Sequence, residues 1–312
     1  MASTLKGKPK MLEVPLRSLL CMMATVVVSA FLLTLIASSI SSPSDCACSR
    51  ANAVGVDAAS TPDGRLAVLV PFRDRFDELI EFVPHMYSFL RHQGLDFEIF
   101  VLNQVDQFRF NRASLINAGF KTVRQYYDYI AIHDVDLLPL NLNLSYAKPQ
   151  SGRPFHVAAP NLHPRYHYST FAGGILLITT QDFEMVNGMS NKFWGWGLED
   201  DDFYDRMIEA HFKVTRPTNV ATDSSNTFRH IHDSAWRKRD TNKCFDQNRE
   251  TRRKDRTTGI IDVNYQLRAT HHLKINNLPF TLLNIELECD KVLTPWCECD
   301  QSSFFNIFSG VF

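Results

Sequence analysis

The feature that most constrains the fold is an alternation of short apolar runs with helix-like segments. Leu66 to Val70 is continuously apolar, as expected for a strand buried on both faces, and Phe76 to Leu90 carries apolar residues at helical spacing. Further strands are predicted at Phe97 to Leu102 and Tyr129 to His133, with a helix at Arg112 to Val123 between them. This order predicts an α/β fold, with parallel strands joined by crossover helices.

The second half of the chain is less regular. A strand is predicted at Gly174 to Thr179 and a helix at Glu199 to His211, whose acidic first turn suits the positive end of a helix dipole. Beyond Val214 the pattern becomes irregular, with a charged stretch from Asp233 to Asp262.

The N-terminus carries a long apolar run from Leu19 through Ile40, preceded by basic residues. A bilayer span needs about 20 residues, whereas the apolar region of a cleaved signal peptide, the alternative, has about 7 to 15. The charge asymmetry places the N-terminus in the cytoplasm. We expect a tail at 1–17, a signal anchor at 18–40, a stem at 41–64 and a lumenal domain at 65–312.

The charge balance excludes one class of partner. The chain has 33 basic and 34 acidic residues, so no global field would attract nucleic acid. A nucleic-acid binder that uses the basic run Arg249 to Arg256 was the alternative, but such a run is usually a solvated face.

Six cysteines lie beyond the apolar run, an even number that could all pair in an oxidising compartment. Cys289 with Cys297 is the preferred pair. A zinc site built from these two and Cys299 is the alternative, although no histidine follows and the spacing fits no standard finger. Asn143-Leu144-Ser145 is an N-glycosylation acceptor if the domain is lumenal.

Two clusters point to a metal site. Asp134-Val135-Asp136 follows a predicted buried strand, where open α/β sheets bind ligands, and two carboxylates there can hold a hard cation together with a diphosphate. His230 and His232 stand two residues apart, hence on one face of an extended segment. A histidine pair plus a carboxylate suits Mn²⁺ better than Ca²⁺. The alternative is a pair of surface histidines in a polar loop.

A third cluster joins Trp194-Gly195-Trp196-Gly197 to the acids Glu199, Asp200, Asp201 and Asp202. Glycines between tryptophans disfavour a regular helix or strand, so a mobile loop is predicted. Tryptophan offers a flat face to a sugar ring, and an adjoining acid can act as general base. The alternative is a buried aromatic anchor followed by an acidic helix cap.

These motifs resemble the β1,4-galactosyltransferase family over roughly Leu66 to Asp300. The resemblance rests on the segments Pro71-Phe72-Arg73-Asp74-Arg75, Phe110-Asn111-Arg112-Ala113, Asp134-Val135-Asp136, Phe171-Ala172-Gly173-Gly174 and the Trp-Gly-Trp-Gly stretch. Thr227, the pair His230 and His232, the segment Tyr166-His167-Tyr168 and the ending Thr294-Pro295-Trp296-Cys297 are similar to its xylosylprotein branch.

The resemblance implies a GT-A fold, a Rossmann-like, mostly parallel sheet flanked by helices, and inverting, Mn²⁺-dependent transfer of galactose from UDP-galactose to β-xylose on a proteoglycan core protein. It also implies a single-pass type II Golgi membrane protein. The implied metal ligands are Asp136, His230 and His232. The implied donor site comprises Pro71, Phe72, Arg73, Arg75, Phe110, Arg112, Asp134, Val135, Trp196 and Glu199. The implied acceptor site comprises Tyr166, Tyr168, Phe171, Trp196, Asp200 and Asp201, with Asp200 as the catalytic base.

Phe171 departs from the tyrosine that the family pattern predicts, which reduces its role to stacking. Two further alternatives are a galactosyltransferase acting on N-acetylglucosamine and a non-catalytic sugar-binding relative. The histidine pair argues against the first, and the presence of Asp200 with both metal clusters argues against the second. Closure of Trp194 to Gly197 and of the charged segment after His232 is expected to exclude water.

Overall fold

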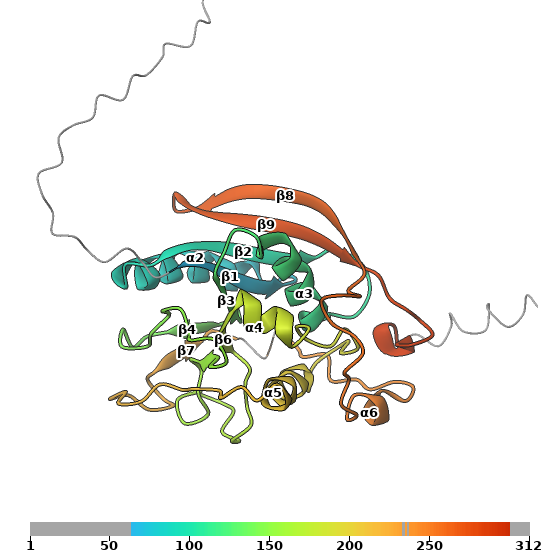
Figure 1. Cartoon of the computed structure of the whole chain (residues 1–312). Coiled ribbons are helices and arrows are strands. Elements are labelled where there is room, and N and C mark those ends of the chain that lie inside the picture. Colours follow the sequence, from blue (N-terminus) through green and yellow to red (C-terminus); the bar gives the residue numbers. More distant parts are fainter. Residues whose placement is uncertain (1–63, 233–234, 236, 300–312) are drawn as a thin grey trace, which may run out of the picture. The chain divides into compact units, whose positions relative to one another are not determined.

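The computed structural model describes residues 64–232, 235 and 237–299, and these residues form a mixed sheet with helices on both faces (Figure 1). The strands of the main sheet follow the order β5-β6-β3-β1-β2-β9-β8. Their bounds are β1 Arg65–Phe72, β2 Asp96–Gln104, β3 Tyr129–His133, β5 Phe155–His156, β6 Ile175–Thr179, β8 Tyr265–Ile275 and β9 Leu278–Leu287.

The centre of the sheet is parallel and its edges are antiparallel. β1 pairs in parallel with β2 and β3, and β2 pairs in parallel with β9. β6 runs antiparallel to β3, as do β5 to β6 and β8 to β9. The predicted α/β class is confirmed, and the sheet is mixed rather than mostly parallel.

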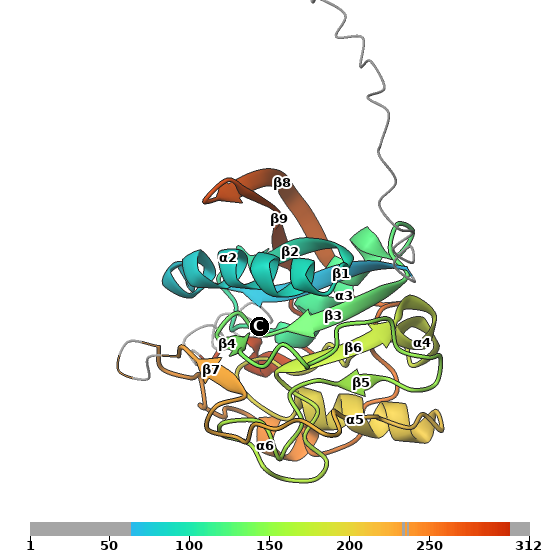
Figure 2. The same cartoon turned by 90° about the vertical axis from the view of Figure 1, so that its left-hand side faces the viewer.

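Alternate residues of the central strands enter two separate cores, because successive strand side chains point to opposite faces. Leu66, Val68 and Val70 of β1 pack with helix α2, whereas Ala67 and Leu69 pack with helices on the other face. Figure 2 shows α2 separated from α3 by the sheet. The bounds are α2 Phe76–His92, α3 Arg112–Val123, α4 Thr180–Met185, α5 Glu199–Glu209, α6 Gln247–Glu250 and the 3₁₀ helix η1 Pro295–Cys297.

A second, two-stranded sheet joins segments that are far apart in the sequence. β4, Leu137–Pro139, pairs antiparallel with β7, Phe228–His230, in the register Leu137 to His230. The acidic triplet directly precedes β4, and the histidine pair lies at the end of β7. This short ladder therefore brings the two predicted metal clusters together.

The hairpin β8–β9 was missed at the sequence level, where the region beyond Val214 was expected to be irregular. The two strands flank Asn276 and Asn277, both of which have positive φ, 50° and 62°. Two such residues are typical of the tight turns that join antiparallel strands. β9 lies beside β2 in the main sheet, so this hairpin completes one edge (Figure 1).

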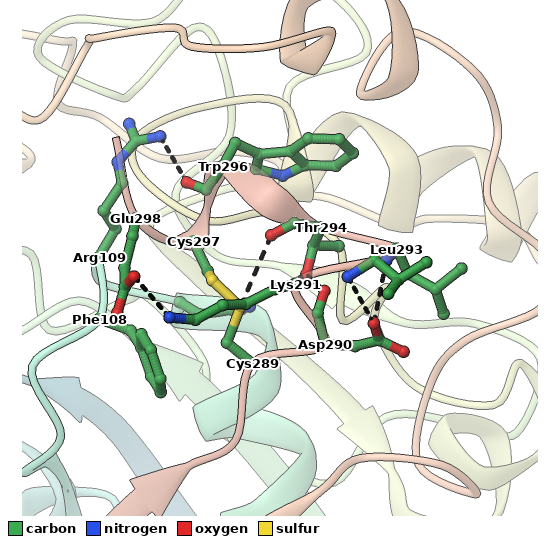
Figure 3. Close-up of a disulfide and its surroundings, with 12 residues drawn as sticks. Phe108, Arg109, Cys289, Asp290, Lys291, Leu293, Thr294, Trp296, Cys297 and Glu298 are labelled. Atoms are coloured by element: carbon green, nitrogen blue, oxygen red, sulfur yellow. Dashed lines mark hydrogen bonds and ion pairs between the residues drawn. A yellow bond between two sulfur atoms is a disulfide. The ribbon is translucent and has the colours of Figure 1, made fainter. Parts of the chain in front are cut away.

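Two disulfides fasten the end of the described chain. Cys289 is bonded to Cys297, as predicted, with Cα atoms 6.3 Å apart (Figure 3). Cys244 is bonded to Cys299, with Cα atoms 5.7 Å apart. The zinc alternative is wrong, because its three thiols are consumed by these bonds.

Among residues 64–232, 235 and 237–299, no helix has the length and apolarity that a membrane crossing requires. The predicted anchor and stem lie outside the described residues.

A buried ion network fixes α5 to the charged stretch. The Arg206 guanidinium donates to the Asp202 carboxylate (3.0 Å) and to the carbonyl oxygens of Asp255 and Thr258, both at 2.8 Å. The Asp255 carboxylate accepts from Ser190 Oγ at 2.6 Å. This bond and those from neighbouring threonine hydroxyl and backbone N–H groups hold the pKa of the Asp255 carboxyl well below its usual range in spite of burial. Within the basic run the basic side chains Arg249, Arg253 and Lys254 are exposed, as expected of a solvated face, whereas the acidic Asp255 is buried and structural.

We predict that Asp255→Ala lowers the free energy of unfolding by about 3 to 5 kcal/mol, because the substitution removes one of the two carboxylates paired with the buried Arg206 and takes away the acceptor of the Ser190 and Thr258 hydroxyl groups. Urea denaturation followed by circular dichroism measures the loss. Glu250→Ala is the matched control, since its ion pairs with Arg249 and Arg253 lie at the surface and should contribute less than about 1 kcal/mol. Equal losses in the two variants would contradict the account.

Candidate active site

A cavity of about 670 Å³ lies where β1 and β3 end. Its walls come from all three sequence clusters, so residues predicted from separate motifs meet around one space. The predicted site residues that line it are Pro71, Arg73, Arg75, Phe110, Arg112, Asp134, Val135, Asp136, Tyr166, Tyr168, Phe171, Trp196, Glu199, Asp200, Asp201, His230 and His232.

One arm of the cavity is fit for a divalent metal. The two imidazoles stack 5.6 Å apart and face the same oxygen, with His230 Nε2 3.7 Å and His232 Nδ1 3.3 Å from Asp136 Oδ2. Ligand atoms that each lie about 2.1 Å from one ion at right angles are about 3.0 Å apart. A contraction of a few tenths of an ångström would therefore let all three groups share one ion.

The protonation of these groups agrees with that use. Burial lowers the pKa of both His230 and His232, which favours neutral rings with free lone pairs. The buried His232 Nδ1 has no hydrogen-bond partner within the described residues. The described part of the chain nevertheless contains no three ligand-type side chains already closed into a preformed cage. The shared Asp136 oxygen and the unpartnered His232 nitrogen lie close enough for a bound ion to pull the three groups into its coordination shell.

His133 fixes the backbone at the start of the acidic triplet. Burial lowers the pKa of its ring to about 4, so the ring is neutral. Its Nδ1 lies 2.9 Å from the Asp134 carbonyl oxygen and can donate to it, while the Tyr146 hydroxyl donates to Nε2 at 2.9 Å. This buried chain sets the direction in which the residues after β3 leave the sheet.

The opposite wall is the acidic first turn of α5. Burial, with Glu199 and Asp201 close by, raises the pKa of Asp200 to about 8. Arg112, on α3, forms ion pairs with Asp134 at 2.8 Å and with Glu199 at 4.0 Å. Asp200 thus has the proton affinity that suits a general base near neutral pH.

Gly173 allows Asp200 to approach the aromatic wall. A Cβ on Gly173 would lie 2.6 Å from Asp200 Oδ2 and 2.7 Å from the Phe171 ring, closer than side chains tolerate. Phe171 is only 3% exposed and packs against the rings of Tyr166 and Tyr168, with centroids 5.1 and 5.5 Å apart. A flat apolar face therefore stands beside the proposed base.

The two tryptophans of the glycine-rich loop have different roles. Trp196 is 44% exposed and lines the cavity. Trp194 is 2% exposed and packs edge-on against Phe108, which makes it part of the core. The alternative of a buried aromatic anchor therefore applies to Trp194, and the expectation of a mobile lid stays a prediction for the rest of the loop.

One predicted donor-site residue, Phe72, lies away from the cavity, and a second, Arg73, lines it with its guanidinium already bonded. Phe72 is buried in the core that α2 covers, because it points to the opposite face of β1 from the cavity. Arg73 lines the cavity, but its guanidinium donates to the carbonyl oxygens of Phe108 (2.6 Å) and Asp106 (2.9 Å). Arg73 therefore shapes the loop after β2, whereas Arg75 is held by Glu78 at 3.3 Å at the cavity wall.

Several lining residues were not predicted. Arg239 places its guanidinium 5.1 Å from the Trp196 ring and 5.8 Å from the Tyr166 ring. Lys238 and Lys243 come from the same segment, and His163 lies beside the aromatic wall. These cations belong to the charged stretch, whose composition alone does not distinguish a cavity wall from a solvated surface.

Taken together, the cavity joins a cation-binding arm, basic groups suited to phosphate oxygens, a carboxylate base and stacking faces for a sugar ring. These are the parts that a sugar transfer from an activated diphosphate donor requires.

Comparison with known proteins agrees with this chemistry. A family profile described as the N-terminal region of glycosyl transferase group 7 matches residues 57–148, and one described as a galactosyltransferase domain matches 153–231. Beta-1,4-galactosyltransferase 7 of Drosophila melanogaster is 57% identical over 239 residues, 77% of this chain and 74% of that protein. The xylosylprotein 4-beta-galactosyltransferase of Caenorhabditis elegans is 48% identical, over 75% of this chain and 82% of that protein.

A solved structure has the same fold. It is a mutant of the Drosophila β1,4-galactosyltransferase 7 in complex with manganese, UDP-Gal and xylobiose. The TM-score is 0.75 at 56% identity, and the match covers 76% of this chain and 99% of that one. The expected GT-A type of catalytic domain is thereby confirmed.

We predict that His232→Ala weakens Mn²⁺ binding by at least about tenfold while leaving the thermal unfolding midpoint within a few degrees, because a ligand is lost but no core contact is. Isothermal titration with MnCl₂ measures the affinity. The control is His272→Ala, on the exposed strand β8. Unchanged affinity in His232→Ala would remove this residue from the metal site.

Proposed function

Because the chain belongs to the β1,4-galactosyltransferase family, we propose that its cavity transfers galactose from UDP-galactose to the 4-hydroxyl of β-xylose, with inversion and with Mn²⁺ as cofactor. The observation that carries this proposal is the position of Asp200. This carboxylate has a raised pKa, lies against an aromatic wall and shares the cavity with the Asp136, His230 and His232 arm.

The donor is assigned to the half of the cavity that contains the metal arm. Asp136, His230 and His232 would hold Mn²⁺, which when bound neutralises charge on the departing diphosphate. Arg75 and Arg112 lie on the same wall and supply guanidinium forks for phosphate oxygens. The Asp134 carboxylate accepts a hydrogen bond from Arg112, and Glu199 forms an ion pair with it. When Arg112 binds phosphate instead, both carboxylates can accept hydrogen bonds from hydroxyl groups of UDP-galactose.

The acceptor is assigned to the aromatic half. Tyr166, Tyr168 and Phe171 form one continuous wall, and Trp196 provides an exposed ring. Xylose has no hydroxymethyl group at C5, so a narrow space between these rings would favour it over hexoses. Burial raises the pKa of Asp201, and the nearby Tyr168 hydroxyl partly offsets that effect, so both groups lie at the same site.

The reaction needs one base and no covalent enzyme intermediate. Asp200 takes the proton of the acceptor hydroxyl while that oxygen forms its bond to the galactose anomeric carbon, and the bond from this carbon to the UDP oxygen breaks. Arg112 holds the carboxylates of the cavity in place, and the aromatic wall excludes water that would hydrolyse the donor.

We also propose a cellular setting, a single-pass Golgi membrane protein whose lumenal domain acts on xylosylated core proteins. Two disulfides support an oxidising compartment. Asn143 is exposed in its Asn-Leu-Ser acceptor sequence, which supports lumenal glycosylation. The proposed anchor is the apolar run Leu19 to Ile40.

We predict that Asp200→Asn keeps UDP-galactose affinity and loses about a hundredfold to ten-thousandfold in kcat, because the amide has the same shape and cannot take a proton. In the unsubstituted chain the base acts only when deprotonated, so kcat should rise with pH towards a plateau above a pKa of about 8. Stopped assays across pH 6 to 9 measure both. Asp205→Asn, on the same helix, is the control, and normal turnover in Asp200→Asn would move the base to Glu199 or Asp201.

The acceptor prediction separates xylose from N-acetylglucosamine. We expect efficient transfer to an aryl β-xyloside, little or none to an aryl N-acetylglucosaminide, and at least a tenfold rise in xyloside KM in Tyr168→Ala, because a stacking face is lost (an estimate of about 1 to 2 kcal/mol). Radiolabelled UDP-galactose with both acceptors at equal concentration measures the preference. Preferential labelling of N-acetylglucosamine would contradict the xylose assignment but not galactosyl transfer.

A further inference from the structure

Arg109 stands behind the cavity wall with every donor of its guanidinium in use. Nε and Nη2 donate to the two Asp240 carboxylate oxygens at 2.6 and 3.0 Å, and Nη2 also donates to the Asn242 carbonyl at 2.7 Å. Nη1 donates to Gln247 Oε1 at 2.8 Å and to the Trp296 carbonyl at 3.0 Å, a bond drawn in Figure 3. A guanidinium has five N–H groups, so none is left over.

These acceptors come from two segments that are far apart in the sequence and that the Cys244–Cys299 disulfide also links. Asp240 and Asn242 belong to the charged segment after the metal-binding histidines, and Gln247 begins α6. Trp296 lies in η1, after the end of β9 and directly before Cys297. Cys297 and Cys299 each belong to one of the two disulfides. Arg109 therefore joins the charged segment to the disulfide-fastened end of the domain.

The same segment holds the loop that carries the exposed tryptophan. Trp196 N–H donates to the Asp240 carbonyl at 2.8 Å, and Lys243 Nζ donates to the Trp196 carbonyl at 2.9 Å. Gln247 Nε2 donates to the Trp194 carbonyl at 2.7 Å. Asp240 and Gln247 are themselves bonded to Arg109, and Lys243 directly follows Asn242, whose carbonyl also accepts from Arg109.

Gly195 shows how closely Arg109 and this loop are fitted. A Cβ on Gly195 would lie 2.1 Å from Arg109 Nη2 and 2.6 Å from Cζ, so no other residue fits while Arg109 keeps its place. Gly195 also has φ of 79°, in the left-handed region that favours glycine. Because Gly195 has no side chain, the Arg109 guanidinium can pack against the backbone between the two tryptophans.

We propose that Arg109 is a positioning residue for the acceptor sugar: it fixes Trp196 by holding Asp240 and Gln247, the residues that bond to the tryptophan loop. The inference rests on the proposed function, in which Trp196 stacks on the acceptor. Arg109 lies outside the cavity lining and touches neither sugar nor metal ligand. Its effect reaches the reaction only through the placement of Trp196 and of the charged segment that closes the cavity.

The proposed role predicts more hydrolysis of UDP-galactose when Arg109 is substituted, which a purely structural role would not predict. When the acceptor site is loose, water can take the place of the acceptor hydroxyl. Its oxygen bonds to the galactose anomeric carbon, the bond to the UDP oxygen breaks, Asp200 receives the proton, and free galactose and UDP are formed. Loss of the Arg109 contacts should therefore change the partition between hydrolysis and transfer, beyond any change in the amount of folded protein.

The test uses the full-length chain with Mn²⁺, UDP-galactose and an aryl β-xyloside. Arg109→Lys keeps the charge but cannot reproduce a five-donor fork. We expect the xyloside KM to rise about tenfold and the hydrolysis-to-transfer ratio to rise about tenfold, with UDP affinity within about twofold, since small misplacements of a positioned group have effects of this size or larger. Asp240→Asn, at a side chain that is 40% exposed, removes the ion pair and one of the two oxygens that accept from Arg109, but keeps the carbonyl that accepts from Trp196, and should shift both quantities in the same direction by less.

Arg206→Lys is the matched control, because the Arg206 side chain is also buried, 3% exposed against 10% for Arg109, and also donates to backbone carbonyls, but away from the tryptophan loop. It should lower stability and leave the partition of the folded enzyme unchanged. If Arg109→Lys and Asp240→Asn both fold and keep the original KM and partition, the inference is wrong although the proposed function stands. If Arg109→Lys does not fold, Asp240→Asn alone decides. Absence of xyloside transfer by the unsubstituted chain overturns the proposed function and this inference with it.

Discussion

The antiparallel pairing of β4 with β7 is the contact on which the site depends. It consists of three residue pairs, and it is extended by the bond from Ile231 N–H to the Asp136 carbonyl at 2.9 Å. Through it the acidic triplet after β3 and the histidine pair, nearly a hundred residues later in the chain, face one space. Phe228 and Leu137 anchor the two strands in the core that α2 covers, so the ladder is fixed by apolar burial as well as by hydrogen bonds.

The second constraint is the concentration of carboxylates around a cavity that is partly shielded from solvent. Asp134, Asp136, Glu199 and Asp200 all line it, and Arg112 is the cation placed between the two acidic walls. Burial raises the pKa of Asp136, Glu199 and Asp200, because charged carboxylates are costly away from water. Such an arrangement favours a bound divalent cation on one wall and leaves the other wall with a carboxylate that readily accepts a proton.

Much of this could be predicted from local sequence, and the failures have a common cause. The strand and helix from Leu66 to Leu90 and the helix at Arg112 to Val123 were confirmed, since continuous apolar runs and helical spacing are local signals. The candidate metal and base residues could be singled out because acid triplets and paired histidines carry their chemistry in a few positions, and the structure brings these candidates to one cavity. Phe72, Trp194 and Arg109 were misplaced or missed because their surroundings depend on residues far away in the chain. Arg109, for example, bonds to Asp240 and Trp296, and nothing in its own segment indicates those partners.

In the proposed arrangement, one cavity holds the metal and donor on the β4–β7 side and presents Asp200 to the acceptor on the other. The most direct measurement is crystallographic, with Asp200→Asn protein soaked in Mn²⁺, UDP-galactose and an aryl β-xyloside and data collected for the anomalous signal of manganese. The account predicts a manganese peak about 2.2 Å from Asp136, His230 and His232, with a xyloside hydroxyl within hydrogen-bond distance of residue 200. A peak elsewhere, or an acceptor bound away from Asp200 while the donor is present, would contradict it.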